Sequence, residues 1–99
     1  LTLPLSDFLY AEAQKNCVDI YFLREGHVEH QQLRTTLTSV LADANEKSIF
    51  QCHRSFIVNL SNIRSAHGNS NGYQLTVGDE HHTVPVSRSY VPKLRSFVG

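Results

Sequence analysis

The chain has no methionine, no tryptophan and only two cysteines among its 99 residues. Two cysteines outside any CxxC spacing, Cys17 and Cys52, do not make a disulfide scaffold, so we expect reduced thiols. No apolar run approaches the roughly 20 residues that a membrane-spanning helix needs, and no signal peptide is recognisable. We therefore expect a cytoplasmic protein that does not contact the membrane. Because position 1 is not methionine, we also expect a part of a longer protein.

The chain also lacks a net charge, since nine Lys and Arg balance nine Asp and Glu. This balance argues mildly against a nucleic-acid-binding protein, which usually has an excess of basic residues. The distribution is uneven, however. From Lys47 onward, the sequence contains six basic residues and only two acidic ones, Asp79 and Glu80. A neutral total can therefore hide a basic face on a chain whose size and 40% hydrophobic content indicate one domain spanning residues 1–99.

Motifs of the common enzyme classes are missing as well. There is no P-loop, no GxGxxG, no HExxH, and no GxSxG elbow around Ser55. Six histidines invite a metal-site hypothesis, but His27 and His30 are three apart in a strand-like segment and would face opposite sides. We therefore predict no enzymatic activity, no metal and no cofactor.

Most apolar segments are short, alternate with polar residues and are rich in β-branched and aromatic residues, which is typical of strands. A strong loop signal of Gly, Asn and Ser occupies residues 68–72, and Pro85 favours a sheet edge or a strand end. The predicted strands cover residues 8–11, 18–23, 28–33, 50–52, 56–58, 73–77 and 82–86.

Two segments have helical periodicity. Thr36 is a suitable N-cap for a helix over residues 37–44, whose apolar side chains fall on one face. Ser87 or Ser89 could cap a C-terminal helix in which Pro92 must lie within the first turn. The pattern predicts a mostly β protein with one or two short helices.

Polar residues fill three breaks between the predicted elements. These are Lys15 with Asn16, Arg54 between His53 and Ser55, and residues 87–89. Arg and Asn side chains form bidentate hydrogen bonds with guanine and adenine in the major groove, and hydroxyl groups bind phosphates. Binding is thus a better hypothesis than catalysis.

The segment FQCHRSFIVNL, residues 50–60, matches the pattern F-x-x-HRS-aromatic-hydrophobic-VN. With it, the chain resembles the LytTR domain, the DNA-binding output module of many bacterial response regulators. The resemblance covers nearly the whole chain. It includes a first strand that ends in Glu12-Ala13, the spacing of Leu37 and Leu41 in the short helix, and Ser87 before the last helix.

The resemblance implies an elongated fold of small antiparallel sheets with one or two short helices. It also implies that loops on one edge enter successive major grooves of a direct repeat in double-stranded DNA and bend it. The residues implied are Asn16 (or its neighbour Cys17), Arg54 and Arg88 for base contacts, Lys15, Ser87, Ser89 and Lys93 for backbone contacts, and His53 and Asn59 for loop support.

The resemblance further implies a regulator of transcription in a two-component system. An N-terminal receiver domain would then dimerise and hold two of these domains on adjacent repeats. The alternative is a protein–protein interaction module of the same fold with no specific DNA site, and the zero net charge is its main support.

We predict that Arg54→Ala and Arg88→Ala each weaken site-specific DNA binding by about 1–3 kcal/mol, the range of a good base contact. Lys93→Ala should weaken binding to all sequences alike and reduce its salt dependence. Equilibrium titrations with specific and unrelated duplexes measure both effects. Unchanged site-specific affinity in folded Arg54→Ala and Arg88→Ala variants would contradict the assignment.

Overall fold

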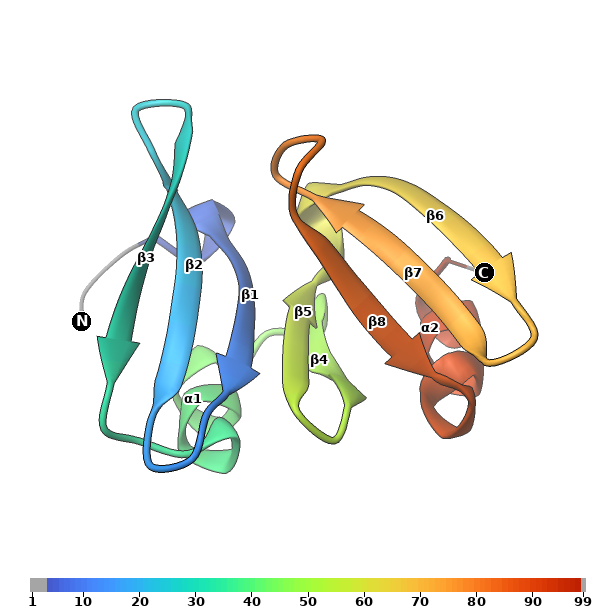
Figure 1. The fold of residues 1–99 in the computed structure, drawn as a ribbon, viewed down its shortest axis with the longest axis horizontal. Helices are drawn as coiled ribbons and strands as arrows, with labels where there is room; N and C mark the ends of the chain where they lie inside the picture. The colour runs from blue at the N-terminus through green and yellow to red at the C-terminus, as the bar shows by residue number, and fades with distance from the viewer. Residues whose placement is uncertain (1–3, 99) are drawn as a thin grey trace.

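The computed structural model describes residues 4–98, which form two antiparallel sheets and short helices (Figure 1). The strands are β1 (Phe8–Ala13), β2 (Val18–Arg24), β3 (His27–Leu33), β4 (Ile49–His53), β5 (Phe56–Asn59), β6 (Ile63–Asn69), β7 (Gly72–Val77) and β8 (Thr83–Ser87). The α-helices are α1 (Leu37–Ala44) and α2 (Val91–Val98), and the 3-10 helices are η1 (Leu5–Asp7), η2 (Leu60–Asn62) and η3 (Arg88–Tyr90).

The strand orders are β3-β2-β1-β5-β4 in the larger sheet and β6-β7-β8 in the smaller one. Each paired strand runs antiparallel to its neighbour, and the extents along the principal axes are 34 × 27 × 22 Å. Figure 1 shows the two sheets beside one another, with α1 next to the larger sheet and α2 next to the smaller one. The predicted fold class, mostly β with small antiparallel sheets and short helices, is confirmed.

Strand β1 lies in the centre of the larger sheet and is buried on both faces. Phe8 and Ala11 belong to the apolar cluster on which α1 packs, whereas Leu9 and Tyr10 belong to the cluster shared with the smaller sheet. A register shift between Phe8 and Tyr10 breaks the regular alternation of the strand. The four consecutive buried residues explain why this segment reads as an uninterrupted apolar run.

Helix α1 begins where the sequence predicts. The Thr36 side chain accepts a hydrogen bond from the Ser39 backbone N–H (3.1 Å), and Asn45 ends the helix in a left-handed conformation (φ 45°). The apolar side of the helix packs on the cluster that contains Phe8 and Ala11, through Leu37, Val40, Leu41 and Ala44. The predicted capping residue and the predicted apolar face are both confirmed, and this face is half-buried.

The loop predicted over residues 68–72 is shorter in the structure. Gly68 and Asn69 end β6, a strand that the prediction missed, and Gly72 begins β7. Only Ser70 and Asn71 form the turn, where the Asn69 Oδ1 accepts a hydrogen bond from the Asn71 N–H (2.8 Å). Strand β6 was missed because all but its first residue are exposed, which removes the alternation between apolar and polar positions.

The C-terminal helix begins later than either serine. Ser87 precedes η3 and its side chain makes no capping hydrogen bond, and Ser89 lies inside η3. The predicted serine cap is therefore wrong, because a 3-10 turn separates β8 from α2. Pro92 does lie in the first turn of α2, and Pro85 lies on edge strand β8. Within residues 4–98, no helix is long and apolar enough to cross a membrane.

Asn59 is buried at the end of β5, away from the β4–β5 turn that it was predicted to support. Its Nδ2 donates to the carbonyls of Leu5 (3.1 Å) and Phe8 (2.9 Å), and its Oδ1 accepts from the Ser61 N–H (3.0 Å). The sequence could not reveal these partners, because two of them lie more than fifty positions away. Asn59 thus ties η1 to the larger sheet and does not support the loop.

Replacing Asn59 with alanine should lower the free energy of unfolding by about 2–4 kcal/mol, because it leaves buried backbone groups without partners. Urea denaturation measures the change. Gln32→Ala, which removes an exposed amide from β3, is the matched control and should stay within about 0.5 kcal/mol of the wild type. Equal stability of both variants would contradict this role of Asn59.

Candidate nucleic-acid interface

The three breaks that carry the candidate residues lie toward one edge of the molecule. In Figure 1 the β1–β2 loop, the β4–β5 turn and the end of β8 all point toward the lower edge. Lys15 and Asn16 lie in the first of these segments, Arg54 in the second, and Ser87 and Arg88 in the third. All except the half-buried Ser87 are exposed. The fold therefore collects residues that are far apart in the sequence.

Arg54 lies on a turn that is fixed by hydrogen bonds on either side of it. The turn consists of Arg54 and Ser55, and the flanking His53 and Phe56 are paired across the strands. The Ser55 N–H donates to the His53 Nδ1 (3.1 Å), and the Ser55 carbonyl accepts from the Ala13 N–H of β1 (2.8 Å). His53 must therefore keep Nδ1 unprotonated in this arrangement.

Gln51 also supports the turn, although sequence reasoning did not identify it. Its Nε2 donates to the carbonyls of His53 (3.3 Å) and Arg54 (3.4 Å). A register shift between Gln51 and His53 allows a side chain of β4 to reach over the turn. In the sequence, Gln51 between Phe50 and Cys52 is simply the polar position of an alternating strand, so no pattern distinguished it.

Asn16 and Arg54 line the same pocket, which has a volume of about 480 Å³. Lys15 and Gln51 contribute to it, and residues 35–38 at the start of α1 form its other side. No Asp or Glu is among the lining residues. The structure thus brings three of the predicted contact residues, Lys15, Asn16 and Arg54, into one positively charged site.

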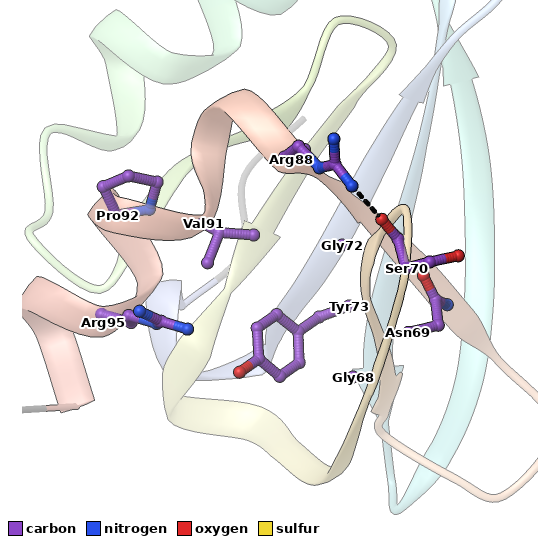
Figure 2. A pocket seen from close by; sticks show the side chains of 9 residues that line it. All are labelled: Gly68, Asn69, Ser70, Gly72, Tyr73, Arg88, Val91, Pro92 and Arg95. Carbon is purple, nitrogen blue, oxygen red and sulfur yellow. Dashed lines mark hydrogen bonds between the residues drawn. The ribbon is translucent and has the colours of Figure 1, made fainter.

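Arg88 lies outside that pocket and lines a second one, between the β6–β7 hairpin and α2 (Figure 2). Its Nη2 donates a hydrogen bond to the Ser70 carbonyl in the turn of the hairpin. This bond engages one of the several N–H donors of the guanidinium, which is exposed in η3. Ser89 is exposed in the same 3-10 helix, and Ser87 is paired with Gly72.

Lys93 lies on a different side of α2 from the groove that Arg88 lines. Its Nζ is 5.9 Å from the centroid of the Phe50 ring on β4, at a distance that permits a cation–π contact. The side of α2 that faces the hairpin carries Arg95 instead. Sequence reasoning did not select Arg95, because a lone arginine near the end of a helix carries no distinctive signal.

The cysteines are free and do not form a reactive pair. Cys52 is fully buried, and its Sγ lies 3.5 Å from the Pro85 carbonyl of β8. Burial raises the pKa of its thiol to about 12, so this group stays protonated. In the part of the chain that the structure describes, no three His, Cys, Asp or Glu side chains converge as a metal site would require.

The fold and this edge define a class of protein, a small antiparallel β module that presents arginine and amide side chains on its strand-connecting turns. The protein-family model for the LytTr DNA-binding domain matches residues 1–99 of this chain. The structure is similar to a solved LytTr DNA-binding domain from Bacillus cereus, with a TM-score of 0.83 and 26% identity over 100% of this chain and 87% of that chain. The chain belongs to the LytTr DNA-binding domain family.

Relatives found by sequence are regulatory proteins that are longer than this chain. It is 35% identical over 96 residues to the transcriptional regulatory protein YpdB of Escherichia coli K12, covering 96% of this chain and 38% of YpdB. It is 34% identical over 74 residues to a response regulatory protein of Vibrio cholerae, covering 74% of this chain and 31% of that protein. The chain therefore spans between 31% and 38% of the length of these relatives.

Replacing His53 with alanine should expose the Ser55 amide, because the turn loses its side-chain acceptor. We expect roughly ten-fold faster hydrogen exchange at Ser55, equivalent to about 1.4 kcal/mol. In His53→Asn, an amide oxygen can accept from the N–H two residues later, so much of the protection should return. Identical exchange in the wild type and His53→Ala would show that the imidazole does not hold the turn.

Proposed function

We propose that this chain is the sequence-specific, double-stranded DNA-binding domain of a bacterial two-component response regulator. The observation that carries the proposal is the shared site of Asn16 and Arg54. These residues come from different strand connections and line one pocket without acidic residues. Arg54 lies in a turn held by hydrogen bonds between the Gln51 and His53 side chains and the backbone. Membership of the LytTr DNA-binding domain family supports the same conclusion.

The chemistry of this pair suits base recognition. A guanidinium offers two parallel donors to guanine O6 and N7, and an amide offers a donor and an acceptor to adenine. Discrimination depends on a fixed position of the side chain, which requires a supporting structure around it. Gln51, His53 and the β1 backbone provide that support at Arg54.

Arg88, which directly follows β8, is the third proposed base contact. Figure 1 shows the end of β8 and the β1–β2 loop on opposite sides of the β4–β5 turn. In this arrangement Lys15, Ser87 and Ser89 bind phosphates beside the bases that are read, and Lys93 adds charge near the strand that leads to Arg54. The two base-reading sites belong to different sheets, which suits successive major grooves of one DNA face. In a dimer bound to a direct repeat, the second domain would make the same contacts at the next repeat of the duplex.

The longer relatives support a regulatory context for this domain. In the proposed full-length protein, residues 1–99 form one domain that follows a receiver domain and acts in the cytoplasm. Dimerisation of the receivers would then raise the effective concentration of a second DNA-binding domain at the neighbouring repeat. The isolated domain should accordingly bind a single site more weakly than the dimer binds a repeat.

Selection of bound duplexes from a random pool, followed by sequencing, tests the proposal. The wild-type domain should enrich a short motif. Arg54→Lys keeps the charge but not the guanidinium fork, so the variant should lose preference at one position and keep the same salt dependence. Arg24→Lys, at an exposed arginine paired with Glu29 (3.3 Å), is the matched control and should enrich the wild-type motif.

One result would count against sequence-specific binding, and a second would count only against the role of Arg54. Motif-free binding that disappears as salt is raised would favour the alternative, a protein–protein interaction module of this fold. Retention of the complete motif by Arg54→Lys would remove Arg54 from the set of base contacts.

A further inference from the structure

A groove of about 670 Å³ separates the β6–β7 hairpin from α2. Of the residues that line it, only Arg88 has a role in the function proposed above. Figure 2 shows Arg88 at one end of the groove and Arg95 farther along α2, directed toward the ring of Tyr73. Val91 lies above that ring, and Asn69 lines the hairpin side. The groove therefore combines two guanidinium groups, an amide, and an apolar floor.

The charge of the groove is entirely positive. Among the described residues that line it, Arg88 and Arg95 are the ionised side chains and none is Asp or Glu. Arg95 is exposed in the last turn of α2. Two guanidinium groups facing one open groove repel each other, and an anion between them would offset this repulsion. This arrangement fits a ligand that carries negative charge along its length.

The walls of the groove are fixed by contacts within the described residues. Arg88 donates to the Ser70 carbonyl, and Asn69 closes the turn through its bond to the Asn71 N–H (2.8 Å). Gly72 has φ 136°, and a Cβ there would lie only 2.1 Å from the Val86 carbonyl oxygen. The hairpin therefore closes directly onto β8 and forms a groove that is already shaped before a ligand binds.

We propose that this groove binds the sugar–phosphate backbone of DNA beside the base that Arg88 reads. The inference rests on the proposed function and extends it to residues that no motif indicated. Arg95 would pair with a phosphate, Asn69 and the Tyr73 hydroxyl could donate to phosphate oxygens, and the apolar floor suits deoxyribose. Arg88 belongs both to the groove and to the DNA-facing edge, so one strand can pass continuously from one to the other.

An acidic protein segment would satisfy the same two arginines, but it would not explain this continuity. The DNA backbone is therefore the ligand to which the proposal commits. If the ligand were an acidic protein segment, replacing Arg95 would weaken binding of that segment and would leave the affinity for DNA unchanged.

The test is the salt dependence of DNA binding by the 99-residue chain, measured with the selected motif and with a scrambled duplex. Losing one phosphate contact changes the slope of log K against log salt by about 0.9. Arg95→Ala should therefore make the slope of log K against log salt less steep by about 0.9. It should also weaken binding to both duplexes by the same factor. Arg95→Lys should restore the slope, and neither variant should change the selected motif.

Arg64→Ala is the matched control, because Arg64 is an exposed arginine at the opposite end of β6 from the hairpin turn. Its slope should equal that of the wild type. Thermal unfolding of each variant establishes that the fold is intact. A wild-type slope in folded Arg95→Ala overturns the groove proposal, and an acidic protein partner would give this result.

Failure of the proposed function is a separate result, because it is measured by motif selection with the wild-type chain. If the wild-type chain selects no motif, sequence-specific recognition fails, whatever Arg95→Ala does. If it selects a motif and Arg95→Ala keeps the wild-type slope, only the groove proposal fails.

Discussion

The burial of β1 on both faces is the constraint on which the rest of the structure depends. One face supports the apolar side of α1, and the other supports the smaller sheet through Leu9 and Tyr10. A strand in this position cannot present polar side chains on either side without leaving them unsatisfied, so its sequence must be apolar throughout its centre. Polar residues appear only where β1 ends, and there the chain reaches the edge that carries the candidate residues.

The same core also determines how the two candidate sites are placed relative to one another. Arg54 is attached to the larger sheet and Arg88 follows the last strand of the smaller one. Cys52, two residues before Arg54, contacts Pro85, three residues before Arg88, where β4 packs against β8. Close packing of the interior resists small shifts between sheets. The separation of the two arginines is thus a property of the core.

Much of the fold could be predicted from the sequence, and the reasons are local. Seven strands, the N-cap of α1 and the edge position of Pro85 follow from alternation, capping chemistry and the missing N–H of proline. Strand β6 could not be predicted, because it is almost entirely exposed and is held by backbone pairing with β7. The role of Asn59 was mistaken because its partners lie far away in the sequence.

The candidate site was predictable to a lesser extent. The resemblance indicated Asn16, Arg54 and Arg88, and the structure brings the first two into one pocket. Gln51 and Arg95 were not identified, because their importance comes from a register shift in one case and from the approach of a hairpin in the other. Such features arise from tertiary packing, so a pattern of residue types along the chain does not contain them.

Among the described residues, strand β3 pairs with a strand on one side only, since it ends the larger sheet. Of its seven residues only Val28 and Leu33 are half-buried, each contacting a different apolar cluster, while the rest are exposed histidine, glutamate and glutamine. An edge with polar and charged side chains is a poor template for strand addition by a second molecule. This edge therefore does not promote aggregation when copies of the chain come close together.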